Sequence, residues 1–417
     1  MRAFQLVICC AILAGCVRNP SPLPTALSSG DAPTWRATQH STATQPHAGA
    51  TYKTLYRFKG SPDGALPMSN LVAMNGGLYG ATDEGGNNGY GTIFKMSPSG
   101  AERVVHTFPL GGIGPEASEE NLLALGGKLY GTNNDDVFEV SASGKGRILH
   151  DFKAAPDGGG WSRGPLIAVN GELYGTTVGG GISSGYCGEQ AWQGCGTVFE
   201  VSTSGAERVL YRFKGSPDGD SPNTGVTVFN GKLYGTTANG GAAATGSTSE
   251  GGTLFEVSMS GKERVLHRFK GTPDGADPYY GKLIVLNGIL YGATLYGGEN
   301  GLGTFFEVTT SGKERVLHSF DSEDGGGVTS LTTLDGQIYG TSARGGASGG
   351  GTIFEMSTSG EERVLYSFSS FTGVPVPSNP GGLLALDHKL YGITEVGGEK
   401  GCKNEGRGCG TVFEFSP

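Results

Sequence analysis

From residue 52 onward, the chain alternates apolar and polar residues in short runs that recur roughly every 50 residues, the period typical of kelch-type propeller blades. Alternation with a period of two indicates β-strands, and no helical period persists within any unit. The clearest apolar anchor is Leu or Ile followed by Tyr-Gly. It occurs seven times, with its tyrosine at Tyr79, Tyr130, Tyr174, Tyr234, Tyr291, Tyr339 and Tyr391.

Each unit is predicted to contain four short strands. In the first unit we expect them at residues 71–74, 78–82, 91–97 and 102–108. Turn residues separate the apolar runs, because Asn-Gly tolerates the positive φ that tight hairpins require. The same kind of turn recurs at Asn170-Gly171, Asn230-Gly231, Asn287-Gly288 and Asp335-Gly336. The second unit departs from the pattern, with almost no loop between its second and third strands.

The two ends of the repeat array complement each other. Residues 52–58 form a fourth strand without its first three, and the last unit stops after its third strand at residues 410–415. If the first segment completes the last unit, the sheet edges of an open array disappear. The sequence therefore predicts an all-β protein, a closed seven-bladed β-propeller of four antiparallel strands per blade over residues 51–417.

The amino terminus has a different character. Arg2 and an apolar stretch precede Leu13-Ala14-Gly15-Cys16, which resembles a bacterial lipoprotein lipobox, and the stretch is too short to span a membrane. We expect residues 1–15 to be a signal peptide and Cys16 to be lipidated. Residues 16–50 are rich in Ser, Thr, Pro and Ala and are predicted to be a disordered tether. Since Val17 is not an aspartate, we expect the outer membrane or cell surface.

Composition and charge exclude one structural class and one class of partner. The 417 residues include 77 glycines without a Gly-X-Y period, which excludes collagen. A net charge of −9 without basic clusters gives no electrostatic signature of nucleic-acid binding. The only membrane contact we expect is through the lipid anchor.

The repeat motifs carry a family resemblance. The segments GTIFKMSPSGAERVVHTF, GTVFEVSTSGAERVLYRF and GTLFEVSMSGKERVLHRF each follow a Leu-Tyr-Gly segment and usually a Gly-Gly pair. They resemble the Gloeo/Verruco tandem repeats of bacterial surface and exported proteins over residues 52–417. This resemblance supports the scaffold and implies no particular chemistry, because the family has no general assigned activity.

Strand order sorts the loops onto two faces. Loops between the second and third strands, and between blades, share one face, which we call the loop face; tight turns occupy the other. The loop face has long loops at residues 179–195, 239–251 and 397–409, and variable loops on a rigid scaffold usually carry binding residues. Candidate ligand-binding residues there are Tyr90, Trp161, Arg163, Tyr186, Trp192, Tyr279, Tyr280, Tyr296, Arg344 and Glu395.

Repeated polar residues are interpreted as scaffold. Asp-Gly pairs between blades could suggest calcium, but a turn in which Asp bonds its own backbone is the favoured interpretation, because the oxygen spacing matches no known calcium loop. One position of the fourth strand holds either His or Tyr, which suggests space filling between blades. The Glu-Arg pairs that begin this strand are interpreted as solvated strand ends. We expect no catalytic residue, metal or cofactor.

Four cysteines remain after the signal region. Each of Cys187 with Cys195 and Cys402 with Cys409 lies in one loop, so local disulfides are the favoured pairing, with a zinc site as the alternative. Disulfides fit an exported protein.

The function predicted from these features is a non-catalytic binding or interaction module at the bacterial envelope, with a glycan or protein ligand on the loop face. Two alternatives stay open, because a fold alone does not decide function. One is a polysaccharide-active enzyme, a hydrolase or lyase that uses carboxylates on the loop face. The other is a structural surface protein.

Overall fold

The computed structural model describes residues 49–109, 122–133, 135–153, 157–158, 164–182, 187, 194–241, 251–369, 378–398, 402 and 407–417. They belong to one compact unit, and β-strands are the only regular elements among them. The signal peptide, Cys16 and almost all of the tether lie outside these residues. None of the described residues belongs to an apolar helix long enough to cross a lipid bilayer.

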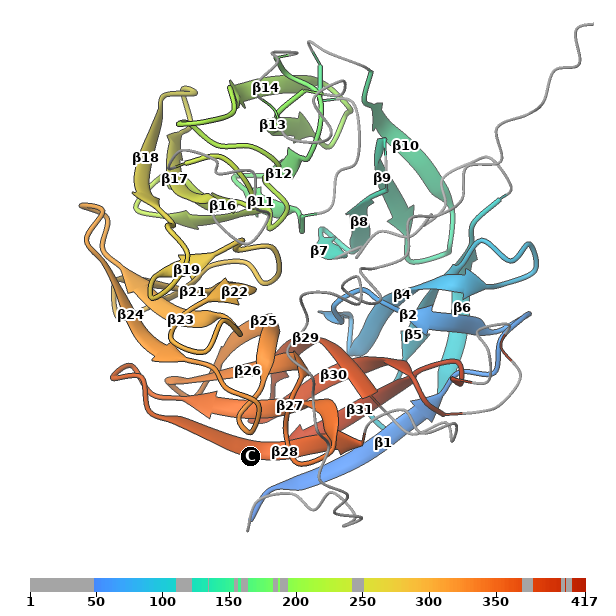
Figure 1. Cartoon of the computed structure of the whole chain (residues 1–417). Coiled ribbons are helices and arrows are strands. Elements are labelled where there is room, and N and C mark those ends of the chain that lie inside the picture. Colours follow the sequence, from blue (N-terminus) through green and yellow to red (C-terminus); the bar gives the residue numbers. More distant parts are fainter. Residues whose placement is uncertain are drawn as a thin grey trace, which may run out of the picture. The chain divides into compact units, whose positions relative to one another are not determined.

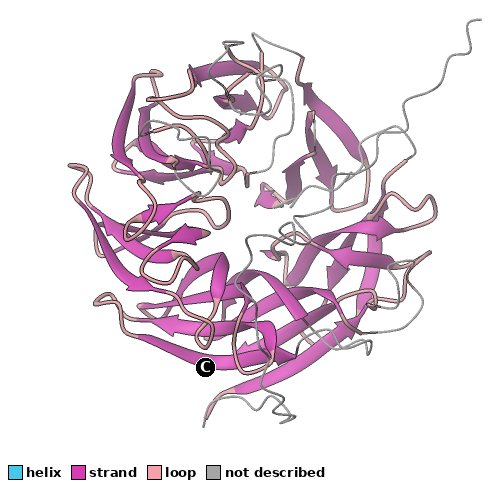
Figure 2. Cartoon of the chain, in the orientation of Figure 1, coloured by secondary structure: helices cyan, strands magenta, loops and turns pink. Residues whose placement is uncertain are grey.

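Seven four-stranded antiparallel sheets follow one another around a ring, as Figures 1 and 2 show. Numbering the blades along the chain, the first three consist of β3 (Val72–Met74), β4 (Gly77–Gly85), β5 (Thr92–Met96) and β6 (Glu102–Thr107); β7 (Leu123–Leu125), β8 (Lys128–Thr132), β9 (Asp136–Ser141) and β10 (Gly146–Asp151); and β11 (Ile167–Val169), β12 (Glu172–Thr177), β13 (Thr197–Ser202) and β14 (Glu207–Arg212).

The remaining blades repeat the same order. They consist of β15 (Val226–Phe229), β16 (Lys232–Thr237), β17 (Thr253–Ser258) and β18 (Glu263–Arg268); β20 (Ile284–Leu286), β21 (Ile289–Ala293), β23 (Thr304–Val308) and β24 (Glu314–Ser319); β25 (Gly326–Leu334), β26 (Gln337–Arg344), β27 (Gly349–Met356) and β28 (Glu362–Ser369); and β29 (Ser378–Leu386), β30 (Lys389–Val396), β31 (Thr411–Ser416) and β1 (Thr51–Arg57). Of three further short strands, β2 (Gly64–Pro67) pairs with the end of β4 in the first blade, and β19 (Gly275–Ala276) pairs with β22 (Tyr296–Gly297).

The predicted closure is confirmed. Strand β1 pairs antiparallel with β31, from Thr51 opposite Ser416 to Arg57 opposite Thr411, and so completes the seventh blade. In Figure 1 the blue β1 lies beside the red β31. The strands of the first unit also match their predicted ranges within a few residues. The largest difference is that β4 continues to Gly85. The short loop of the second unit is present too, between Thr132 and Asp136.

The core lies in the seams, a term we use for the interfaces between neighbouring blades. The phenylalanine that follows the outer strand of one blade packs edge-on against the third-strand phenylalanine of the next. Phe58 with Phe94 and Phe213 with Phe255 show this contact, with ring centroids 5.1 and 5.0 Å apart. Such pairs contribute beyond their buried area.

This packing explains the glycine of the Tyr-Gly anchor. A Cβ placed on Gly80 would lie 2.5 Å from the Phe94 ring, and Gly235 stands in the same relation to Phe255 at 2.6 Å. Only glycine leaves room for the ring. The anchor used to count blades in the sequence is therefore a requirement of seam packing.

We expect the closing strand to contribute strongly to stability through Tyr52. Its ring stacks on Tyr366 at 4.4 Å and contacts Phe413 at 5.2 Å. Tyr52→Ala should lower the free energy of unfolding by about 3 kcal/mol, because truncating a packed aromatic ring leaves a cavity. Lys53→Ala, at an exposed neighbouring position, should change it by less than about 0.5 kcal/mol. Urea denaturation measures both, and equal effects would contradict the closure.

Candidate functional site

A β-bulge in each outer strand determines what meets at the seams. In all seven blades the pairing between the third and outer strands shifts by one residue. In β18, Glu263 is opposite Val257 and His267 is opposite Leu254. Side chains alternate along a strand, so the shift turns these two residues to opposite faces of the blade. Each outer strand thus directs its glutamate to the preceding seam and its His or Tyr to the following one.

Five seams contain two carboxyl groups from different blades. One belongs to the Asp of the Asp-Gly pair between blades, and the other to the glutamate that begins the next outer strand. The five pairs are Asp63 with Glu102, Asp157 with Glu207, Asp218 with Glu263, Asp274 with Glu314 and Asp324 with Glu362.

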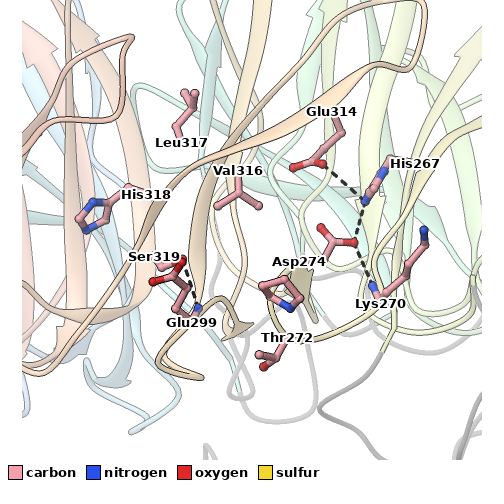
Figure 3. A pocket seen from close by; sticks show the side chains of 11 residues that line it. His267, Lys270, Thr272, Asp274, Glu299, Glu314, Val316, Leu317, His318 and Ser319 are labelled. Carbon is pink, nitrogen blue, oxygen red and sulfur yellow. Dashed lines mark hydrogen bonds and ion pairs between the residues drawn. The ribbon is translucent and has the colours of Figure 1, made fainter.

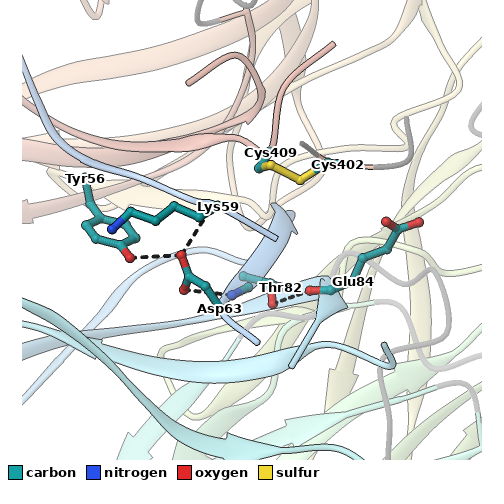
Figure 4. Close-up of a disulfide and its surroundings, with 8 residues drawn as sticks. Tyr56, Lys59, Asp63, Thr82, Glu84, Cys402 and Cys409 are labelled. Carbon is teal, nitrogen blue, oxygen red and sulfur yellow. Dashed lines mark hydrogen bonds between the residues drawn. A yellow bond between two sulfur atoms is a disulfide. The ribbon is translucent and has the colours of Figure 1, made fainter. Parts of the chain in front are cut away.

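The aspartates have the backbone contacts expected of turns. Asp63 accepts hydrogen bonds from the amides of Lys59 at 3.0 Å and Gly64 at 2.7 Å, as Figure 4 shows. Asp274 repeats this with Lys270 and Gly275. The interpretation of Asp-Gly as a turn element is supported. A contact that the sequence did not indicate is added, because Asp63 also accepts a hydrogen bond from the Tyr56 hydroxyl at 2.9 Å.

The glutamates differ sharply from the aspartates. One carboxylate oxygen of each is buried without a hydrogen-bond partner, namely Oε1 of Glu102, Glu207, Glu263, Glu314 and Glu362. Burial, reinforced by the neighbouring aspartate, raises the pKa of Glu102 and of Glu263 to about 7. The prediction that the Glu-Arg pairs are solvated strand ends is therefore wrong for the glutamates. The bulge, which no sequence pattern displays, turns them into the seams.

In two seams of the described residues, a histidine nitrogen and both carboxylates lie within 4.8 Å of one another; the seam of His318, Asp324 and Glu362 has the same residue types without this spacing. His267 Nε2 lies 3.1 Å from Asp274 Oδ2 and 4.0 Å from Glu314 Oε2, as Figure 3 shows. His150, Asp157 and Glu207 form the second such group, with His150 Nε2 at 3.6 Å from Asp157 Oδ2. The first group borders an open pocket of about 800 Å³ that Thr272, Glu299 and His318 also line.

The other seams use related contacts. Tyr211 donates a hydrogen bond to Asp218 at 2.8 Å, just as Tyr56 does to Asp63, and His318 Nε2 lies 2.7 Å from Asp324 Oδ2. In five of the seven seams the His or Tyr at this position thus contacts an aspartate, a role more specific than the predicted space filling.

The two carboxyl groups occur together or not at all. The loop after His106 contains no Asp-Gly, and Gly146 replaces the glutamate of the next outer strand. The loop after Tyr366 also lacks an aspartate, and there Tyr52 takes the glutamate's place and stacks on Tyr366. This joint presence indicates that the Asp and the Glu act as a pair.

A separate polar cluster lies on the loop face between the fourth and fifth blades. The rings of Tyr279 and Tyr280 contact each other edge-on, with centroids 4.6 Å apart, and both are half-buried. Asp277 Oδ1 and Asn223 Oδ1 are buried oxygens without a hydrogen-bond partner. Burial raises the pKa of Asp277 to about 7. We call these four residues the Tyr279 cluster; Asn223 comes from the loop before the fourth blade, and the other three come from the loop after it.

Hydrogen bonds through Thr236 connect the two loops that carry these residues. Thr224 Oγ1 and Thr236 Oγ1 lie 2.9 Å apart, and Thr236 donates to the carbonyl of Pro278 at 3.1 Å. Since Thr224 follows Asn223 and Pro278 precedes Tyr279, the network joins both halves of the cluster. Asp277 has a positive φ of 51°, and its amide donates to the carbonyl of Gly251 at 3.0 Å.

The structure places the other predicted ligand-binding residues in different surroundings. Tyr90 packs against an apolar cluster of the core, and Tyr296 pairs with Ala276 in the small β19–β22 sheet. Arg344 and Glu395 are half-buried near the ends of β26 and β30. These four residues belong to four different blades, and Tyr296 pairs beside Asp277 of the Tyr279 cluster. Trp161, Arg163, Tyr186 and Trp192 lie outside the described residues.

Both predicted local disulfides are present. Cys187 is bonded to Cys195, and Cys402 to Cys409, which Figure 4 shows near the first blade. Cys409 is fully buried in a core cluster, and its carbonyl accepts a hydrogen bond from Leu66 of the next blade at 2.9 Å. The disulfides therefore attach the long loops to the core. They are typical of exported proteins.

Comparison with known proteins agrees with this architecture. The family model of the Gloeobacter/Verrucomicrobia repeat matches residues 43–247 and 241–417. A search of curated proteins finds no match. A solved structure of puromycin hydrolase is similar at 14% identity and a TM-score of 0.51, covering 79% of this chain and 50% of that one.

Two further solved structures are more distant. A gluconolactonase from Xanthomonas campestris has 14% identity and a TM-score of 0.39, covering 69% of this chain and 82% of that one. A luciferin-regenerating enzyme has 12% identity and a TM-score of 0.43, covering 70% and 88%. The likeness to puromycin hydrolase, at 14% identity, shows the fold alone, and the chain spans about half the length of that protein.

The buried glutamates should make stability depend on pH. A carboxyl group with a raised pKa keeps its proton in the folded state while the unfolded chain loses it, so stability falls as pH rises from about 4.5 to about 7. Glu263→Gln removes this loss. The variant should match the wild type at pH 4.5 and exceed it at pH 8 by roughly 1 kcal/mol, a value that allows for solvent screening.

Urea denaturation at the two pH values tests this expectation. Glu361→Gln, at an exposed position beside another of these glutamates, should be as stable as the wild type at both pH values. A Glu263→Gln variant that is less stable than the wild type at pH 8 would mean that the carboxylate is favourably bound.

Proposed function

The chain belongs to the family of Gloeobacter/Verrucomicrobia repeat proteins, and we propose that it is a non-catalytic module that binds glycans through its loop face at the bacterial envelope. The Tyr279 cluster carries this proposal. It combines two aromatic rings with two oxygen acceptors whose hydrogen-bonding capacity is unused. Such a combination suits a ligand with apolar faces and hydroxyl donors.

The chemistry of the cluster favours a glycan over a protein. Both unpartnered atoms are carboxyl or amide oxygens, and sugar hydroxyls can donate to them. The C–H face of a pyranose can pack against a tyrosine ring. A buried acceptor without a partner costs free energy in the free protein, which a hydroxyl donor would recover on binding. Protein recognition remains an outcome of the test below.

A polysaccharide hydrolase or lyase is less well supported. Glycoside hydrolysis usually needs two carboxyl groups within about 10 Å of each other. Asp277 has the raised pKa of a general acid, but burial alone causes the shift, and no neighbouring charge in the described part of the chain contributes to it. The carboxyl pairs that do converge lie in the seams between outer strands.

Attachment to the envelope rests on the sequence of the amino terminus. We propose that Cys16 is lipidated and that residues 17–50 hold the propeller away from an outer membrane or cell surface, with the lipid as the only membrane contact. The two disulfides support export, because such bonds persist in oxidising compartments. Radiolabelled palmitate incorporation that Cys16→Ser abolishes would test the anchor.

A glycan array with the fragment from residue 49 onward tests the binding proposal. We expect specific binding that Tyr280→Ala weakens by at least about tenfold, since aromatic stacking and acceptor loss together exceed roughly 1.4 kcal/mol. Asp277→Asn should also weaken binding, because an amide group that donates hydrogen bonds would replace one of the carboxylate oxygens that accept them. Lys313→Ala, in an exposed turn on the opposite face, is the matched control and should bind normally.

Other results would favour the alternatives. Release of reducing sugar from a bound polysaccharide, lost in Asp277→Asn, would indicate an enzyme. Silence across glycan and envelope-protein arrays would favour a structural surface protein. Binding unaffected by Tyr280→Ala and Asp277→Asn would place the ligand elsewhere on the molecule.

A further inference from the structure

We propose that the seams at His267, Asp274 and Glu314, and at His150, Asp157 and Glu207, are binding sites for a divalent transition metal such as Zn²⁺. In each seam one histidine nitrogen and two carboxylate oxygens from neighbouring blades converge within 4.8 Å of one another. Imidazole and carboxylate are ligands that zinc accepts. The sequence suggested a metal only as calcium on the aspartates or zinc on the cysteines, because no sequence pattern places the glutamate of one blade beside the histidine of another.

The spacing of the groups fits a tetrahedral ion. Ligand atoms at about 2.0–2.1 Å from zinc lie roughly 3.3 Å from each other in a tetrahedron. The distances from His267 Nε2 are 3.1 Å to Asp274 Oδ2 and 4.0 Å to Glu314 Oε2, which bracket that value. Small side-chain adjustments would therefore bring all three atoms onto one ion.

The surroundings hold the ligands in place while leaving them able to bind. The amides of Lys270 and Gly275 donate to Asp274 and fix the orientation of its carboxylate, which retains free lone pairs. The side chain of Glu314 is only 10% exposed, and its Oε1 has no hydrogen-bond partner. A buried carboxyl oxygen without a donor is costly, and a cation in the seam would compensate it.

One side of the His267 group remains open. The pocket beside it, drawn in Figure 3, leaves space for water or another small ligand as a fourth donor. Three protein ligands and one open position are typical of reactive rather than purely structural zinc sites.

Another seam of the same chain can be compared with the His267 seam. In the seam of Tyr211, Asp218 and Glu263, the same two carboxyl groups occur, but a tyrosine hydroxyl that donates to Asp218 replaces the imidazole. The competing explanation for the His267 seam is a hydrogen bond of this kind, with no metal. Replacing His267 by tyrosine converts one type of seam into the other without leaving the range of residues that this fold already accepts.

Zinc titration of the full chain by calorimetry, after removal of metals with a chelator, tests the proposal. We expect a stoichiometry near two, from the two groups of ligands. His267→Tyr should abolish one of the two sites, and His150→Tyr the other. Glu314→Gln, a second variant that preserves shape, should weaken one site by at least about tenfold, the lower end of effects seen even for outer-shell partners. Tyr211→Phe should bind like the wild type.

Absorption of bound Co²⁺ distinguishes this site from surface binding. An ion held by one imidazole and two carboxylates should give visible d–d bands of low symmetry that disappear in His267→Tyr. His388 and Asp335 form an exposed pair that could bind zinc weakly. Zinc binding that is lost in His388→Ala but retained in His267→Tyr and Glu314→Gln, or no binding at 100-fold molar excess over protein, would overturn the proposal.

Discussion

Antiparallel pairing of β1 with β31 is the interaction on which the rest of the molecule depends. It turns a linear array into a ring, so that every blade has a neighbour on each side and every seam has two walls. Without it, β31 would be an exposed edge, and the aromatic contacts of Tyr52 with Tyr366 and Phe413 would be lost. Closure also fixes which loops share a face, and so which residues can act together.

The seams are the part of this fold in which ionisable side chains of successive repeats come together. In five blades the bulge of the outer strand turns a glutamate to one seam and a histidine or tyrosine to the other, and seam packing then places them beside the aspartate of the intervening loop. The buried carboxyl groups have different hydrogen-bond partners in different seams. Asp218 is bonded to a tyrosine hydroxyl, and Asp274 to a histidine nitrogen. In one of the two seams without the acids, Tyr52 and Tyr366 fill the space by stacking, and in the other His106 Nδ1 lies 2.8 Å from the carbonyl oxygen of Gly144.

The scaffold was predictable because its signals are local. Seven Tyr-Gly anchors, Asn-Gly turns and the complementary ends are each visible in short stretches of sequence, and the turn at Asn75 has the expected positive φ of 49°. The paired cysteines were predictable for the same reason. The seam clusters were not, because each glutamate lies about 40 to 50 residues after its aspartate and the bulge that aligns them leaves no sequence signal. Their one visible trace is the joint presence of the Asp and the Glu, and their joint loss around Gly146 and Tyr52.

The pairing that closes the ring can be measured directly by amide hydrogen exchange followed by mass spectrometry. If β1 covers β31, the amides of residues 411–416 have strands on both sides and should exchange as slowly as those of β13, the corresponding strand of the third blade. Exchange of residues 411–416 at the rate of an exposed edge strand, with β13 still protected, would contradict the ring and the site assignments built on it.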